Sequence, residues 1–298
     1  LYYKGMATVP SDSLCYPAKL VHGHIMDLVE RGVDKIFYPC IPYNIIDSNH
    51  LGDNHYNCPV VASYAENIRA NMDVLRERNI RFLQPFLPLD NKKRMIERLT
   101  EELGGTEGLA KDEIKTAVLA AYEEIEHYKQ DVRDYGESIL QELEKTQQPA
   151  IMLVGRPYHI DPEIHHGIAD MIASYGLAIL SEDAVYHLPV KGAGLNIVNQ
   201  WSYHARLYHA AHFVAEHDNL TLIQLSSFGC GLDAVTMGQV KAILENNNRI
   251  YTMIKLDEVS NLGAARIRLR SLIAALARRK KTVFQPASEA ERPRFTEE

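Results

Sequence analysis

The sequence has no apolar run near the roughly 20 residues that cross a bilayer, and no leader typical of secreted proteins. It also has no excess of positive charge, because 32 basic residues stand against 39 acidic ones and the formal net charge is −7. This balance argues against a nucleic-acid footprint and against a polybasic membrane patch. We therefore expect a cytoplasmic protein that has neither nucleic acid nor a membrane as a partner.

Cysteine is scarce, with four residues in a chain of 298. Four are too few for a disulfide scaffold, and a chain of this length buries enough surface to fold without one, so we expect a reducing compartment. The hydrophobic fraction of 46% excludes global disorder. The chain begins with Leu1 rather than Met, so we expect it to be part of a longer polypeptide.

Several common motifs are missing from the sequence. It has no C-x-x-C pair, which argues against a zinc ribbon and a ferredoxin motif, and no H-E-x-x-H metalloprotease motif. It has neither G-x-x-x-x-G-K-[ST] nor G-x-G-x-x-G, so we do not expect an ATP or dinucleotide site within this chain.

Short apolar runs alternate with longer amphipathic segments along the chain. This rhythm is typical of βαβ units with a parallel sheet, so we predict an α/β fold with an N-terminal lobe (1–147) and a C-terminal lobe (148–298). The predicted strands cover residues 34–38, 81–85, 150–155, 178–181, 220–225 and 250–255, and the predicted helices cover 18–31, 60–79, 91–103, 164–175, 195–216, 232–246 and 261–280.

A long segment between the two halves has the pattern of an amphipathic helix. Apolar residues recur every three or four positions from Ile114 to Leu143. Such a helix either packs along its own domain or forms an arm that binds a second copy or a partner. Gln147-Gln-Pro149 follows it and marks the predicted boundary between the lobes.

The four cysteines all lie where a predicted strand ends or a predicted helix begins. Cys15 and Cys58 precede helix starts that contain proline, Cys40 follows a strand, and Cys230 lies in Gly229-Cys-Gly231 between a strand and a helix. Ligands bind at that edge of an open α/β sheet, and a helix N-terminus favours the thiolate that a metal needs. The cysteines are either small buried hydrophobes or one shared metal or cluster site. Their positions outside periodic apolar runs favour the site, with Cys230 contributed by the second lobe.

Other candidates are weaker. His22, His24, His204, His209 and His212 have no metal-ligand spacing and read as surface or packing residues. The polar segment 41–57 is long for a loop, and long loops are usually functional or disordered.

The turn Gly155-Arg-Pro-Tyr-His159 joins a predicted strand to a predicted helix. Arg156, Tyr158 and His159 on such a turn are candidates to bind an anion or a thioester carbonyl. The equal alternative is a turn fixed by Pro157, with Asp161 as the cap of the following helix.

These segments together carry a resemblance to a known family. The chain resembles the uncharacterised domain attached to acyl-CoA dehydratase activases, which is similar to the iron–sulfur subunits of 2-hydroxyacyl-CoA dehydratases and benzoyl-CoA reductases. The resemblance covers most of residues 10–275. Its motifs are Cys15-Tyr-Pro-Ala-Lys-Leu-Val-His-Gly-His24, Phe37-Tyr-Pro-Cys40, Asp53-Asn-His-Tyr-Asn-Cys-Pro-Val60, Gly155-Arg-Pro-Tyr-His159 and Phe228-Gly-Cys-Gly231.

The resemblance implies two Rossmann-like lobes with a [4Fe–4S] cluster between them, held by Cys15, Cys40, Cys58 and Cys230. It implies an ATP-dependent activase module as a partner, in the same polypeptide or a separate one, and an acyl-CoA as a candidate ligand. The related subunits hold their cluster through three cysteines, whereas this chain offers four.

That difference leaves three alternatives open. If all four cysteines bind one cubane, no iron is open and the chain is an electron-transfer component. If one cysteine is spare, catalysis at an open iron remains, as in an acyl-CoA dehydratase or reductase subunit. A non-redox binding module would hold zinc or nothing. We favour the redox component that works beside the activase.

Overall fold

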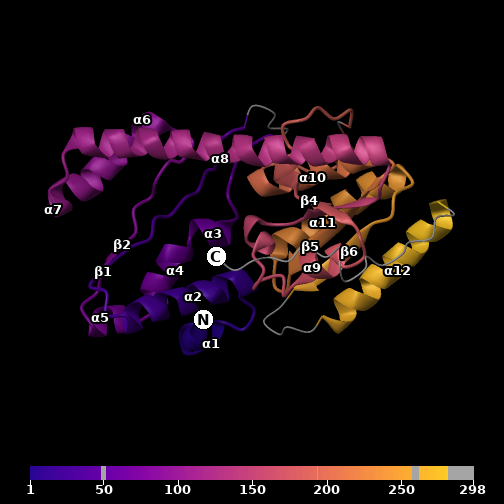
Figure 1. The fold of residues 1–298 in the computed structure, drawn as a ribbon. Coiled ribbons are helices and arrows are strands. Elements are labelled where there is room, and N and C mark those ends of the chain that lie inside the picture. The colour runs from indigo at the N-terminus through magenta and orange to yellow at the C-terminus, as the bar shows by residue number, and fades with distance from the viewer. Residues whose placement is uncertain (48–51, 193, 257–261, 281–298) are drawn as a thin grey trace. The chain divides into compact units, whose positions relative to one another are not determined.

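The computed structural model describes residues 1–47, 52–192, 194–256 and 262–280. Helices and strands alternate along the chain (Figure 1), and all pairing between strands is parallel within the described sheets. The prediction of an α/β fold with parallel sheets is therefore confirmed. The strands are β1 (Lys35–Phe37), β2 (Arg81–Leu83), β3 (Ala150–Val154), β4 (Ala178–Leu180), β5 (Leu220–Ser227) and β6 (Thr252–Leu256).

The helices follow the predicted segments with some breaks. They are α1 (Tyr2–Gly5), α2 (Tyr16–Glu30), α3 (Pro59–Ala62), α4 (Tyr64–Asn71), α5 (Val74–Glu77), α6 (Lys92–Leu99), α7 (Gly105–Glu107), α8 (Lys111–Thr146), α9 (Ile168–Ala173), α10 (Ser202–Glu216), α11 (Gly231–Asn246) and α12 (Gly263–Lys280).

The chain forms two compact units. Unit 1 comprises Leu1–Asp131, Ile197–Ala205 and Gly229–Leu232, and unit 2 comprises Val132–Asn196, Arg206–Phe228 and Asp233–Glu298. The main division falls within α8, which continues to Thr146, rather than between residues 147 and 148. The segment that carries Cys230 belongs to unit 1, although the sequence assigned it to the second lobe.

Unit 1 has a two-stranded parallel sheet, in which β1 pairs with β2. One apolar core lies beside it and joins α2, α4 and α5, and a second core joins the first half of α8 to α6. The first contains Ile25, Val29, Ile36, Ile68, Met72, Leu75 and Ile80, and the second contains Leu87, Met95, Ile114, Val118 and Tyr122.

Unit 2 has a four-stranded parallel sheet in the order β4-β3-β5-β6. All five residues of β3 are buried, as expected for a central parallel strand covered on both faces. The chain runs from β3 to β4 on one side and then returns to β5 on the other side of β3. The strand order therefore reverses between β3 and β5, and the loops that follow these two strands flank the position where open α/β sheets bind ligands.

Two predicted helices differ from the structure. Residues 60–79 form three short helices instead of one, because Ser63 leaves the helical conformation and its hydroxyl donates to the carbonyl oxygen of Pro59 at 2.8 Å. Met72 then interrupts the segment again with a non-helical backbone. The helix predicted from residue 195 begins at Ser202, because the residues before it pair with the segment 53–56.

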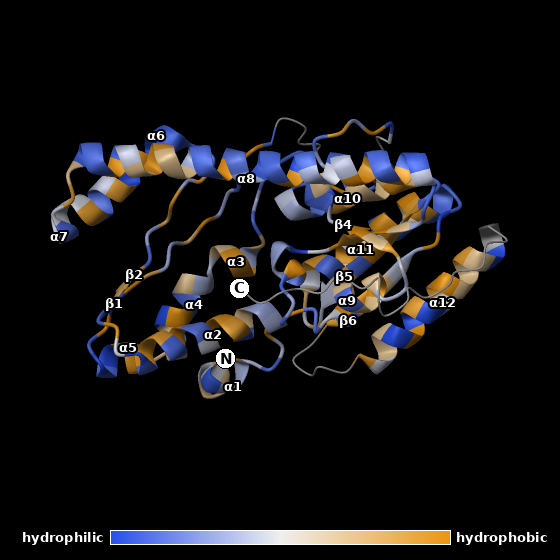
Figure 2. Ribbon diagram, in the orientation of Figure 1, coloured by the Kyte–Doolittle hydropathy of each residue, from blue (hydrophilic) through white to orange (hydrophobic). Residues whose placement is uncertain are grey.

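The predicted long amphipathic helix is present as α8, with 36 residues. Hydrophilic and hydrophobic residues alternate along it (Figure 2), and Ile114, Val118, Tyr122 and Leu143 are buried. These contacts support packing along its own domain over a free arm. Across the described part of the chain, none of the helices combines the length and apolarity required of a membrane span.

Candidate functional site

Three of the four cysteines lie at the first residue before a helix. Cys15 precedes α2, Cys58 precedes α3 and Cys230 precedes α11, and all three are partly exposed. The first N–H groups of a helix have no partner within the helix, so a helix start offers hydrogen-bond donors to a sulfur or an anion. None of the four cysteines forms a disulfide. Three of the thiols thus lie at the starts of helices within unit 1.

The loops that carry Cys15 and Cys230 touch each other through Gly229. A Cβ atom on Gly229 would lie 3.0 Å from the carbonyl oxygen of Ser13 and 3.3 Å from the Cα atom of Cys15. Gly229 also has a φ of +76°, a conformation that favours glycine. The contact between the two loops therefore requires glycine at position 229.

Gly229→Ala should lower the free energy of unfolding by about 1–3 kcal/mol, because alanine is strained at positive φ and its Cβ crowds the Cys15 loop. Gly231→Ala is the matched control, since Gly231 has no atom within 4 Å of an added Cβ and begins a helix. Urea denaturation of both variants measures the difference. Equal stabilities would contradict the close packing of these two loops.

Cys40 has a different environment, since it is only 1% exposed. Burial raises the pKa of its thiol, and the backbone N–H groups of Glu66 and Ala65, in the first turn of α4, oppose this by hydrogen-bonding to the sulfur. Asn57, the neighbour of Cys58, donates from its backbone to Pro42 and from its side chain to Ile41. The segments that follow Cys40 and precede Cys58 therefore lie side by side.

An aromatic cluster immediately precedes Cys58. The ring centroids of Tyr43 and Tyr56 are 4.9 Å apart, and those of Tyr56 and Trp201 are 5.9 Å apart. Backbone hydrogen bonds hold the cluster together, because the N–H of Tyr56 donates to the carbonyl oxygen of Gln200 at 3.0 Å and the N–H of Asp53 donates to that of Asn199 at 2.6 Å. The described part of the long 41–57 loop is thus ordered by pairing within unit 1, while residues 48–51 lie outside the described residues.

The spacing of the thiols bears on which metal they could hold. Among the described residues, which include all four cysteines, no three His, Cys, Asp or Glu side chains are grouped as ligands of a metal ion. Cysteine sulfurs around one zinc ion lie about 3.8 Å apart, whereas the cysteine sulfurs that bind the irons of one [4Fe–4S] cubane lie about 6–7 Å apart. These two spacings distinguish the two kinds of site.

In unit 2, the predicted Gly155-Arg-Pro-Tyr-His159 turn lies after β3, at the reversal of strand order. His159 is 1% exposed, and its Nδ1 accepts the backbone N–H of Arg156 at 2.9 Å. Its Nε2 therefore carries the proton and donates to the hydroxyl of Ser227 at 2.9 Å. Burial lowers the pKa of His159 to about 3, so it is neutral at physiological pH and ties the turn to the end of β5.

Arg156 is also buried, and its guanidinium donates to the carboxylate of Asp233 at 3.1 Å. Asp233 lies in the first turn of α11 and is 1% exposed, so this ion pair joins the turn to a helix 77 residues away in the chain. Tyr158 is partly exposed and packs edge-on against His159 at a centroid distance of 4.4 Å. These contacts support the alternative in which the turn is fixed from within, and the anion- or carbonyl-binding role of Arg156, Tyr158 and His159 stays a prediction.

Glu182 was missed by sequence reasoning and lies two residues after the end of β4. It is 3% exposed, and its carboxylate accepts backbone N–H groups of Glu182 itself and Gly155. Burial raises its pKa to about 8, with a further rise from the neighbouring charge of Asp183 and an opposing effect of Arg206. The available signal was a carboxylate two residues after a parallel strand, but a glutamate in a sequence carries no mark of burial.

Glu182 should make the protein less stable as the pH rises from 6.5 to 8. Its pKa in the folded state is above the ordinary value of 4.5, so the folded state holds a proton that the unfolded state has lost. Stability should therefore fall by about 1.6 kcal/mol across this window, with the slope close to about 1.4 kcal/mol per pH unit at pH 6.5 and about half of that at pH 8. Urea denaturation at pH 6.5 and pH 8 measures the slope, and Glu182→Gln should remove that contribution. The same pH dependence in both proteins would contradict a protonated Glu182.

The histidines that the sequence assigned to packing roles include two with clear partners. His22 is buried and hydrogen-bonds to Thr8 at 2.8 Å and to Asn67 at 3.1 Å, and burial lowers its pKa. His209 is buried and donates from Nε2 to the carbonyl oxygen of Leu188 at 2.8 Å. Both residues fasten neighbouring segments together, which agrees with the packing interpretation.

The fold and the site define an α/β protein with four thiols collected in one unit and a parallel sheet in the other. Residues 1–185 match the family described as the CoA enzyme activase uncharacterised domain, and the chain belongs to this family. The resemblance to a domain associated with acyl-CoA dehydratase activases is thereby confirmed. The matched range contains Cys15, Cys40, Cys58 and the turn at residues 155–159, and it ends before Cys230. No curated protein sequence matches the chain.

Proposed function

We propose that unit 1 binds a [4Fe–4S] cluster through Cys15, Cys40, Cys58 and Cys230, and that the chain is a redox component of an acyl-CoA dehydratase or reductase system. The observation that carries this proposal is the collection of all four cysteines in one compact unit, at strand ends and helix starts. Thiolates are the ligands that iron–sulfur clusters use, and four of them complete the coordination of one cubane.

The residues around the thiols fit this role. The approach of Gly229 to the Cys15 loop brings two of the thiol-bearing segments together, and the N–H groups of Ala65 and Glu66 supply hydrogen bonds to the sulfur of Cys40. Hydrogen bonds to sulfur and solvent exposure set the reduction potential of such a cluster. When bound, the cluster would supply one-electron chemistry.

The partner in this proposal is an ATP-dependent activase module, in the same polypeptide or a separate one. Support comes from the family, whose description names a CoA enzyme activase. The sequence of this chain offers no nucleotide-binding motif of its own, so the energy of ATP would have to come from the partner. An acyl-CoA is the expected ligand of the complete system.

Anaerobic reconstitution of the purified chain with iron and sulfide tests the proposal. We expect a brown protein with a thiolate-to-iron absorption near about 400 nm, and a reversible one-electron reduction seen by electron paramagnetic resonance. A colourless protein that retains its fold after reconstitution, or one that binds zinc in place of iron, would contradict it.

A second function is favoured by the burial of Cys40. Cys40 is 1% exposed, while Cys15, Cys58 and Cys230 are partly exposed at helix starts, which is a division of three and one. With Cys40 spare, one iron would be open to a substrate and the chain would be a catalytic dehydratase or reductase subunit. Cys40→Ser separates the two functions, since it should remove iron from a four-cysteine site and leave a three-cysteine site filled.

A further inference from the structure

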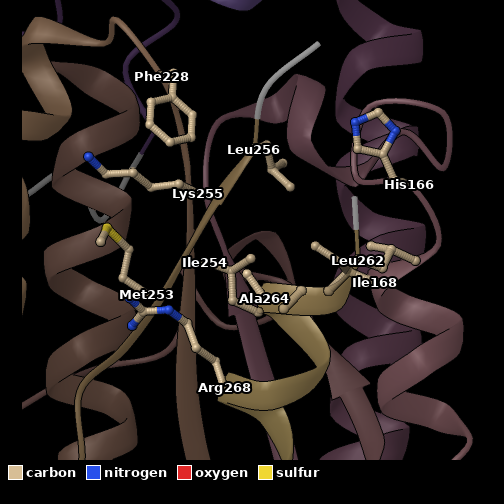
Figure 3. A pocket seen from close by; sticks show the side chains of 11 residues that line it. His166, Ile168, Phe228, Met253, Ile254, Lys255, Leu256, Leu262, Ala264 and Arg268 are labelled. Carbon is tan, nitrogen blue, oxygen red and sulfur yellow. The ribbon is translucent and has the colours of Figure 1, made fainter. Parts of the chain in front are cut away.

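A cavity of about 570 Å³ lies in unit 2, at the carboxyl ends of β5 and β6. Its volume is typical of pockets that hold small organic ligands, roughly 300–1,000 Å³. The elements around it are the end of β6, the residue that follows β5, the start of α9 and the first turns of α12 (Figure 3). This is the edge of the sheet where open α/β folds bind ligands.

The floor and walls of the cavity are apolar. Ile168, Ile254, Leu256 and Ala265 are all buried at 5% exposure or less, and each contributes to the lining. Apolar walls of this kind favour a ligand with a hydrocarbon or aromatic body, because that body leaves water when it binds.

The polar groups that line the cavity are cationic or hydrogen-bond donors. Lys255 and Arg268 lie on one side of it and His166 on the other (Figure 3). Neither Lys255 nor Arg268 forms an ion pair with a described carboxylate, and the described lining contains no acidic residue. The ammonium group of Lys255 lies 5.1 Å from the ring centroid of Phe228, so an aromatic face holds this cation at the cavity.

The backbone is strained at His166, which lines the cavity. Its φ is +53°, and the following Gly167 has a φ of +79°. A residue other than glycine rarely adopts this conformation, and such strain concentrates at ligand-binding positions. The strained backbone at His166 and the two cations thus lie around the same cavity.

We propose that this cavity binds a small organic anion, with its apolar body against Ile254 and Ala265 and a single phosphate or carboxylate group on the side of the cavity that carries Arg268 and Lys255. The proposal concerns unit 2 alone and does not depend on the cluster. Arg268 suits either head group, because its guanidinium can donate two parallel hydrogen bonds to two oxygens. The apolar walls give affinity, and the cations select for charge.

Fluorescence titration of the reduced or apo chain with three naphthalene compounds tests this site. The probes are 1-naphthyl phosphate, 1-naphthoate and uncharged 1-naphthol. We expect one or both anions to bind at least about tenfold more tightly than 1-naphthol, since a charge-assisted hydrogen bond contributes about this factor. Comparison of the two anions identifies the preferred head group.

Two variants locate the binding. Arg268→Gln should weaken the binding of the preferred anion about tenfold, while Arg270→Gln, an exposed arginine on the same helix outside the lining, should leave it unchanged. Ala264 lines the cavity at an exposed position, so the larger side chain of Ala264→Leu should fill part of the cavity and weaken the binding of all three probes. Equal binding of anions and 1-naphthol, equal effects of the two arginine variants, or no anion binding by the folded protein would each overturn the proposal.

Discussion

Arg156→Met should lower the free energy of unfolding by about 3–5 kcal/mol. The substitution removes the cation and leaves the carboxylate of Asp233, which is 1% exposed, as a buried charge without its ion-pair partner. An uncompensated buried charge costs far more than the net contribution of the pair, because the desolvation of the carboxylate is no longer offset. Equilibrium urea denaturation measures this loss.

The double variant Arg156→Met/Asp233→Leu should recover much of that stability, because both charges are removed and the volume is kept apolar. Lys241→Met is the matched control in unit 2, since its ion pair with Glu245 is more than half exposed on both sides and should contribute less than about 1 kcal/mol. If Arg156→Met were as stable as this control, the buried ion pair would not be what joins the turn to α11.

Cys230→Ser should lower the amount of iron bound after anaerobic reconstitution by roughly tenfold or more, because the loss of one thiolate ligand weakens the binding of the cluster. Cys230 is the informative cysteine, because it lies outside the residues that match the family. Its loop nevertheless contacts the Cys15 loop through Gly229. Colorimetric iron and sulfide analysis measures the effect.

Ser13→Ala is the control for that experiment. Ser13 lies two residues before Cys15, and its hydroxyl hydrogen-bonds to Ser11 at 2.8 Å in an exposed position. The variant should bind as much iron as the unaltered chain. If Cys230→Ser also bound the full amount, Cys230 would not be a ligand.

The strands could be predicted from the sequence because burial on both faces demands continuous apolar runs. β3 and β5 illustrate this, since nearly every residue in them is buried. The breaks at Ser63 and Met72 could not be predicted, because the apolar periodicity of residues 60–79 continues through both positions. The start of α10 also depends on long-range pairing, since the backbone around Asn199 and Gln200 is taken by the 53–56 segment.

The site could be predicted only in part for a related reason. Pro17 and Pro59 mark helix starts, so the positions of Cys15 and Cys58 follow from local sequence. The ion-pair partner of Arg156 could not be predicted from local sequence, because the order of strands in the sheet brings Asp233 to it. The burial of Glu182 likewise depends on the fold around β3 and β4 and on no local pattern.

The most direct test of the cluster proposal is the composition of the anaerobically reconstituted chain, measured as iron and acid-labile sulfide per protein and by Mössbauer spectroscopy. The proposal predicts about four iron and about four sulfide per chain, with every iron in a tetrahedral sulfur environment. A folded chain that binds neither iron nor sulfide, or that holds zinc instead, would contradict it.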